Sequence, residues 1–109
     1  MKNLNSGDEL LQVLEALSNP YRLKIIAILS EEKQYVSELA RQLGISRPLL
    51  YLHLQKLEEA NLVKGHHEIS VSGKAMKYFQ INSFSLELNE QLIWKMSNSL
   101  TVKKRKSSE

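Results

Sequence analysis

The stretch "LGISRPLLYLHLQKLEEANLV", residues 43–63, carries more apolar side chains than one face of a helix can bury. On a helix that turns about 100° per residue, Leu50, Leu54 and Leu57 fall on one side. His53 lies at the edge of this apolar stripe, and Leu49 and Ala60 flank it. The other side collects Pro48, Tyr51, Leu52, Gln55, Lys56 and Glu59, and Arg47 stands at the helix start. The stretch therefore predicts a helix with an inner face for a core and a polar, cationic outer face.

The segments on either side of this helix carry equally clear patterns. Upstream, "VSELARQLG" (36–44) has apolar residues at helical spacing and ends in Gly44, so it predicts a helix with a glycine stop. Ser46 is placed to cap the next helix, and Pro48 is tolerated in its first turn. Downstream, two short runs flank Ser72-Gly73, which predicts a β-hairpin.

Together these segments predict a helix-turn-helix over about residues 35–60, followed by a β-hairpin wing over about residues 63–81. The fold class is α+β, mainly helical: a winged helix-turn-helix with N- and C-terminal dimerisation helices. The outer face of the helix that begins at Arg47 suits a DNA major groove, where Arg and Lys address guanine or phosphate and Gln pairs with adenine. A surface helix with ordinary polar decoration is the alternative, and the neighbouring helix and hairpin weigh against it.

The remaining elements complete one domain over residues 1–100. A first helix places Leu10, Leu11, Leu14 and Leu17 at helical spacing. A second begins at Asn19-Pro20 and is expected to bury Leu23, Ile26, Ala27 and either Leu29 or Ser30. The polar stretch "SEEKQ" (30–34) then separates this helix from the next one. "FSLEL" (84–88) either extends the wing or forms a loop, and Asn89 caps a last helix over about 89–100. Residues 101–109 are expected to fray as a basic, flexible tail.

The positive charge of the chain is localised. The formal net charge is +3, but residues 1–38 carry four Lys or Arg against six acids, whereas residues 39–80 carry six against three. The tail adds four bases and one acid. A local basic region of this kind indicates a polyanion-binding surface. "KKRK" (103–106) either adds phosphate attraction or serves as a solubilising end.

The sequence argues against several classes of function. The chain has no cysteine, no apolar run near the ~20 residues of a membrane span and no secretion pattern, so a cytoplasmic location is expected. No Gly-rich phosphate loop or catalytic set stands out, so we expect neither an enzyme nor a cofactor. His66 and His67 point to opposite faces of a strand, so no metal site is expected, although one shared between subunits with Glu87 or Glu90 stays open. His53 is expected to donate to a backbone carbonyl.

Trp94 indicates a partner surface. It lies on the side of the last helix opposite Leu92 and Met96, so the core of one chain cannot take both faces. The first helix also carries the surplus apolar residues Leu11 and Val13. We therefore expect a dimer contact built from the two terminal helices. A Trp lying partly exposed on its own domain is the alternative.

Four segments of the chain resemble the ArsR-type winged helix-turn-helix regulators: "EALSNPYRLKIIAIL" (15–29), "VSELARQLGIS" (36–46), "LHLQKLEEANLV" (52–63) and "KYFQI" (77–81). The resemblance runs from about Leu10 to Ile81. It implies a homodimeric DNA-binding regulator, base contacts from the N-terminal half of the helix at Arg47, and backbone contacts from the wing. The chain departs from the family in lacking cysteine metal ligands, in having Leu52 at an often polar or basic position, and in lacking an arginine-rich wing.

We therefore predict a dimeric repressor that binds a near-palindromic operator in double-stranded DNA. The predicted DNA-binding residues are Ser46, Arg47, Pro48, Tyr51, Leu52, Gln55, Lys56, Lys74 and Lys77. The predicted dimer interface consists of Leu10, Leu11, Leu14, Leu92, Ile93, Trp94, Met96 and Leu100. The sequence does not identify the operator or an effector, and a protein-docking module that uses the exposed Tyr51 and Leu52 is the alternative function.

Overall fold

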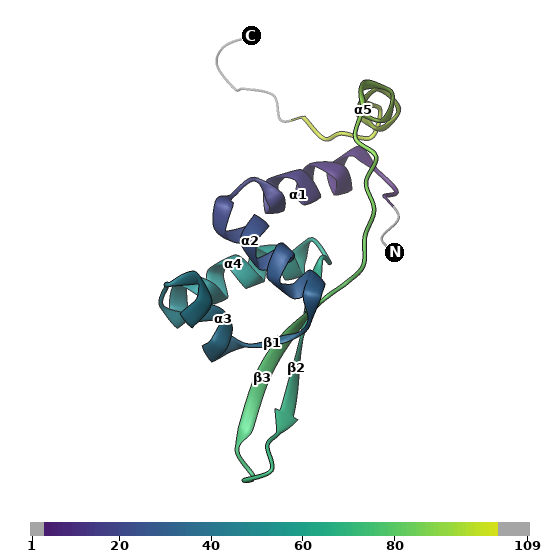
Figure 1. Cartoon of the computed structure of the whole chain (residues 1–109). Helices are drawn as coiled ribbons and strands as arrows, with labels where there is room; N and C mark the ends of the chain where they lie inside the picture. The colour runs from purple at the N-terminus through teal and green to yellow at the C-terminus, as the bar shows by residue number, and fades with distance from the viewer. Residues whose placement is uncertain (1–3, 103–109) are drawn as a thin grey trace.

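The computed structural model of the chain describes residues 4–102 and confirms the predicted order of the helices and the hairpin (Figure 1). In chain order the elements are α1 (Gly7–Leu17), α2 (Pro20–Glu31), β1 (Gln34–Tyr35), α3 (Val36–Leu43), α4 (Arg47–Glu59), β2 (Val63–Ile69), β3 (Ala75–Ile81) and α5 (Glu90–Ser97). Helices α2, α3 and α4 gather at the centre. The β2–β3 hairpin projects from one end of this group and α5 lies at the other. No helix among residues 4–102 is long and apolar enough to cross a membrane.

Local sequence signals set the ends of the helices as predicted. The Asn19 side chain accepts hydrogen bonds from the amides of Tyr21 (2.9 Å) and Arg22 (3.2 Å), and α2 then begins with proline. Ser46 caps α4 by accepting from the amide of Leu49 at 3.3 Å. Gly44 ends α3 at φ 68°, a left-handed conformation that costs glycine little. These caps fix the turn between α3 and α4.

The sheet has three antiparallel strands in the order β1-β3-β2. The predicted hairpin is confirmed: Val63 pairs with Ile81 at its base and Ile69 with Ala75 near its tip, and Gly73 takes φ 85° in the turn. Strand β1 was not predicted. Gln34 was assigned to a polar break, but residues 34 and 35 pair with Phe79 and Tyr78 of β3. We call residues 63–81 the wing.

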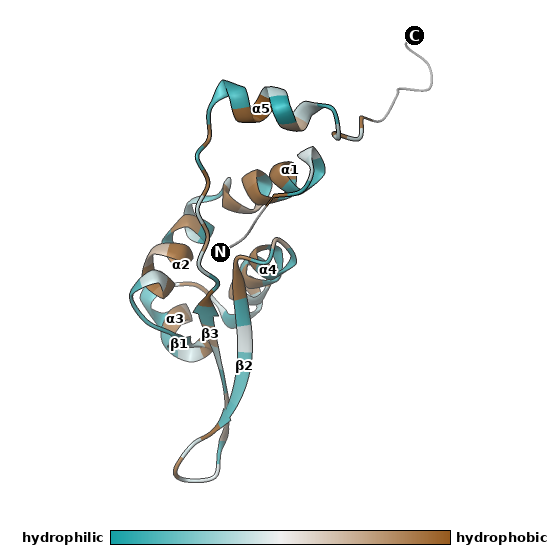
Figure 2. Cartoon of the chain, turned by 90° about the vertical axis from the view of Figure 1, so that its right-hand side faces the viewer, coloured by the Kyte–Doolittle hydropathy of each residue, from teal (hydrophilic) through white to brown (hydrophobic). Residues whose placement is uncertain are grey.

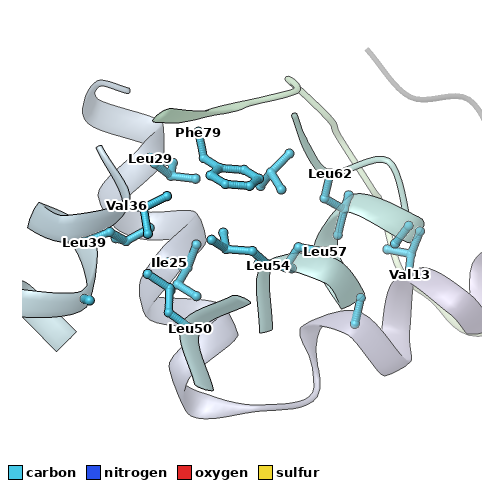
Figure 3. Packing of buried hydrophobic residues seen from close by; sticks show 14 residues of the cluster. Val13, Ile25, Leu29, Val36, Leu39, Leu50, Leu54, Leu57, Leu62 and Phe79 are labelled. Carbon is cyan, nitrogen blue, oxygen red and sulfur yellow. The ribbon is translucent and has the colours of Figure 1, made fainter. Parts of the chain in front are cut away.

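The core lies where α1, α2, α3, α4 and the base of the wing meet (Figure 3). Leu50, Leu54 and Leu57 of α4 point into it as predicted. Two other predictions about burial were wrong. Helix α2 buries Leu29 as expected, but it also buries Ile25, and it leaves Ala27 exposed and Leu23 52% exposed. Leu49, placed beside the α4 stripe, is 38% exposed. The segment "LKIIAIL" (23–29) is apolar on most sides, so its pattern does not reveal which residues face the neighbouring helices.

The C-terminal helix packs on α1 rather than on the core. Residues 82–89 run as a mainly irregular connector from the wing to α5, so "FSLEL" does not extend the hairpin (Figure 2). Gly7 allows a close approach of the two helices, because a Cβ there would lie 2.3 Å from the carbonyl oxygen of Met96. Thr101 donates from its amide (2.8 Å) and hydroxyl (2.6 Å) to the Asp8 carboxylate. These hydrogen bonds lower the pKa of Asp8.

This anchoring corrects the prediction that the tail frays from residue 101 onward, because Thr101 is tied to α1. The expectation for the basic stretch 103–106 lies outside the described residues.

Candidate nucleic-acid interface

Helix α4 has the two faces that its sequence predicts. Its inner face is buried, with Leu50, Leu54 and Leu57 each at most 1% exposed. The predicted outer residues Arg47, Pro48, Tyr51, Leu52, Gln55 and Lys56 are all exposed, and Ser46 is exposed at the cap. Leu52 is 60% exposed and Tyr51 41%. The outer face of α4 is thus free to meet another molecule.

The wing and the start of α4 enclose a hollow of about 320 Å³. Three cationic residues line it, namely Arg47 from α4 and Lys74 and Lys77 from the wing, together with the ring of Tyr51. The predicted site residues at the start of α4 and on the wing therefore come together in space although they are far apart in the sequence. The charge of the hollow suits a phosphate group.

Lys77 and Lys74 lie in different environments within this hollow. The Lys77 ammonium lies 5.9 Å from the ring centre of Tyr51 and 5.3 Å from that of Phe79, and the residue is half-buried. Gly65 makes room for this packing, because a Cβ there would lie 3.1 Å from the Cε of Lys77. Lys74, in contrast, is exposed. Lys77 therefore joins the wing to α4 through its cation–π contact with Tyr51, while Lys74 stays open to solvent.

Gln55 and Lys56 lie on the C-terminal half of α4, outside this hollow. Gln55 donates to Glu59 at 3.4 Å, so its amide is partly engaged within the helix. Lys56 borders a second hollow of about 390 Å³, which is lined by Gln12, Glu15, Ala16, Arg22, Lys56 and Glu59. The structure therefore divides the predicted DNA-binding residues into a cluster at the wing and a separate pair further along α4.

His53, at the inner edge of α4, has a different partner from the one predicted. It was expected to donate to a backbone carbonyl, but its Nδ1 lies 3.1 Å from a guanidinium nitrogen of Arg22. Since arginine can only donate, Nδ1 accepts this hydrogen bond. Arg22 also donates to the carbonyl oxygens of Ala16 (2.7 Å) and Glu15 (3.4 Å), so it joins α1, α2 and α4. Burial, and then the charge of Arg22, lowers the pKa of His53.

The His66-His67-Glu68 cluster is divided as the strand geometry predicts. His67 lines the hollow beside α4, whereas the His66 ring stacks on Tyr78 at a centroid distance of 5.3 Å. Glu68 is bonded to Lys33 and Tyr35. Within residues 4–102 no three His, Asp or Glu side chains are grouped so that they could hold a metal ion.

The predicted interface residues of α1 and α5 differ in how far they remain uncovered. Leu11, Ile93, Trp94 and Leu100 are exposed, with Trp94 at 75%. Leu14, Leu92 and Met96 are half-buried. Leu10 is only 5% exposed, so its own chain already covers it. Val13, taken from the sequence as surplus, is a core residue that is 2% exposed.

Sequence reasoning missed the residues that α3 and β1 bring to the hollow. Tyr35 and Ser37 line it, and so do His67 and Met76 of the wing. No sequence pattern marks these residues, because their place depends on the pairing of β1 with β3. The hollow is therefore formed by the helix-turn-helix and the wing together.

Comparison with known proteins shows which proteins this chain is similar to. Residues 17–66 match the family described as "Helix-turn-helix domain". The chain is 39% identical over 82 residues to an uncharacterized HTH-type transcriptional regulator of Methanocaldococcus jannaschii, a match that covers 75% of this chain and 85% of that protein. It is 36% identical over 63 residues to the biofilm growth-associated repressor of Xylella fastidiosa, covering 58% of this chain and 55% of the repressor. The crystal structure of an ArsR family transcriptional regulator is 25% identical with a TM-score of 0.59, covering 69% of this chain and 77% of the other.

Proposed function

The chain belongs to the ArsR-type helix-turn-helix transcriptional regulators, and we propose that it acts as a homodimer that binds a near-palindromic site in double-stranded DNA. One observation carries this proposal: the exposed outer face of α4 runs directly into the cationic hollow under the wing. A helix that presents donors beside a basic hairpin matches the groove and the phosphates of a duplex.

In this proposal the residues make different kinds of contact with the duplex. Arg47 and Tyr51, at the start of α4, make the leading contacts to bases or phosphates. Leu52 meets a thymine methyl group, because it is the most exposed apolar side chain of α4. Lys74 neutralises a phosphate from the wing. Ser46, Pro48, Gln55 and Lys56 complete the contact surface, and Lys77 contributes mainly by holding Tyr51.

The dimer forms through α1 and α5. Apolar side chains of both helices are exposed, and no residue of α5 is buried within its own chain. A twofold axis between two such surfaces would give an isologous interface. The two copies of α4 would then enter successive major grooves about 34 Å apart and read the two halves of the site.

Repression is the mode of regulation that we propose, on the strength of the similarity to a protein named as a repressor. A dimer bound across a promoter blocks transcription without chemistry, so we propose no catalytic activity. Because its target is DNA, the cytoplasm is the proposed location.

The direct test selects bound duplexes from a random library and then measures their affinity by fluorescence anisotropy. We expect a near-palindromic site, and affinity that falls about 10³-fold between 50 and 200 mM salt if about six phosphates are neutralised. A flat salt response, or no binding to any duplex in dilute buffer, would contradict the proposal and favour protein docking through Tyr51 and Leu52.

The dimer is tested by the substitution Trp94→Asp, which places a charge at the most exposed large apolar residue of α5. Sedimentation equilibrium should show a dimer for the unmodified chain and a monomer for the variant. Leu23→Asp, at an exposed apolar residue of α2, is the matched control and should stay dimeric. A Trp94→Asp variant that remains a dimer would exclude this interface.

A further inference from the structure

Three aromatic rings lie at one level across the three strands of the sheet. Tyr78 of β3 pairs with Tyr35 of β1 on one side and with His66 of β2 on the other. The Tyr35 and Tyr78 ring centres are 6.0 Å apart in an edge-to-face arrangement, and His66 stacks on Tyr78 at 5.3 Å. The rings therefore connect the wing to β1, the strand that leads directly into α3.

A group of charged and polar side chains is built onto these rings. The Lys33 ammonium lies 4.2 Å from the centre of the Tyr78 ring and donates to a carboxylate oxygen of Glu68 at 3.2 Å. The Tyr35 hydroxyl donates to the other Glu68 oxygen. Both oxygens of Glu68, on the wing, are thus engaged by residues that precede α3. These hydrogen bonds lower the pKa of Glu68 and raise the pKa of Tyr35.

Because Glu68 lies on the wing, this group can control the angle of the wing. Strand β1 has only two residues, so its backbone pairing with β3 is short. The wing projects well beyond β1 (Figure 1), and Lys74 lies near its tip. A small change of angle at the base of the wing would therefore move Lys74 by a larger distance at the tip.

The charge of Glu68 also needs an explanation. It is the only acidic residue among residues 63–81, the part of the chain that we expect to face DNA phosphates. A carboxylate there repels a polyanion unless a cation compensates it. Lys33 provides that compensation within the chain.

We propose that Lys33, Tyr35 and Glu68 form a clamp that fixes the angle of the wing, which makes Glu68 a positioning residue for the phosphate contact of Lys74. This inference rests on the proposed DNA binding. Positioning and plain electrostatics predict opposite results for Glu68→Gln. Removing a negative charge strengthens DNA binding if only charge matters, whereas a loosened wing weakens it. We expect weaker binding.

The sharpest test uses two substitutions that each remove one hydroxyl and no charge. Tyr35→Phe removes the hydrogen bond to Glu68 and keeps the ring. Tyr78→Phe is the matched control, because within residues 4–102 the Tyr78 hydroxyl makes no hydrogen bond. In free protein, amide hydrogen exchange in β1 and its β3 partners should accelerate severalfold in Tyr35→Phe and stay unchanged in Tyr78→Phe.

The second measurement is a double-mutant cycle on DNA. In the unmodified dimer, Lys74→Ala should reduce the slope of log affinity against log salt by about two, or one for each protomer. In the Tyr35→Phe background the same change should have a much smaller effect, because Lys74 no longer holds its position. In the Tyr78→Phe background its effect should remain full.

The outcomes separate this inference from the proposed function. If the unmodified chain binds no duplex, the proposed function fails, and the DNA role of Glu68 fails with it. If DNA binding is intact but Tyr35→Phe leaves β1 exchange and the Lys74 effect unchanged, the clamp alone is overturned. A Glu68→Gln variant that binds DNA more tightly also overturns it.

Discussion

Arg47 is the residue whose removal tests the DNA interface most specifically. It is exposed at the first position of α4, and its side chain makes no hydrogen bond or ion pair with other residues in the range 4–102. Arg47→Ala should therefore leave the fold intact. If Arg47 addresses a base, its loss costs about 1–3 kcal/mol, or about 5- to 150-fold in affinity, for each half-site, and the dimer loses both contributions.

The assay is fluorescence anisotropy at fixed salt with two duplexes, the selected operator and a scrambled sequence of the same composition. Arg47→Ala should weaken binding to the operator far more than binding to the scrambled duplex. Arg47→Lys keeps the charge but loses the planar fork, so it should rescue little of the loss. Lys24→Ala, which removes an exposed cation of α2 outside the hollow, is the control and should leave the specificity unchanged.

Two results would refute this reasoning. Unchanged affinity for both duplexes would remove Arg47 from the site. Equal weakening on both duplexes, with a salt slope reduced by about one for each half-site, would make Arg47 a phosphate contact rather than a base contact.

The remaining predictions concern stability, measured by urea unfolding. The folded-state pKa of His53 lies below its ordinary value of 6.5. The stability that neutral His53 contributes is therefore fully present above about pH 6.5 and declines as the pH falls toward the folded-state pKa, with a limiting slope of about 1.4 kcal/mol per pH unit. A His53→Gln variant whose free energy of unfolding changes with pH at the same slope would contradict this. Asn19→Ala removes a helix cap and should cost about 1 kcal/mol without changing DNA affinity; an unchanged urea midpoint would exclude the capping role. Gly65→Ala places a Cβ 3.0 Å from the buried ring of Phe79 and should cost about 1–3 kcal/mol, and a variant as stable as the unmodified chain would show that the ring can move.

The sequence predicts best those parts of the fold that depend on neighbouring residues. The caps at Asn19 and Ser46 and the stop at Gly44 act over three or four residues, so they are visible in the sequence and the structure confirms them. The inner face of α4 was also visible, because Leu50, Leu54 and Leu57 recur at helical spacing.

Features that depend on tertiary contacts were not visible. Strand β1 is too short to show a pattern and exists because Gln34 and Tyr35 meet β3. The partner of His53 is Arg22, 31 residues away, so no local rule identifies it. In the candidate site, the sequence indicated the lysines of the wing but not that Lys77 packs against Tyr51.

The central claim is that the outer face of α4 and the wing together bind duplex DNA. Amide chemical shifts recorded while the operator duplex is added test it most directly, because they report every part of the surface at once. The largest changes should fall in residues 46–56 and 66–77, with little change on the solvent-facing side of α2. Changes concentrated on α2, or an unchanged spectrum at saturating duplex, would contradict the account.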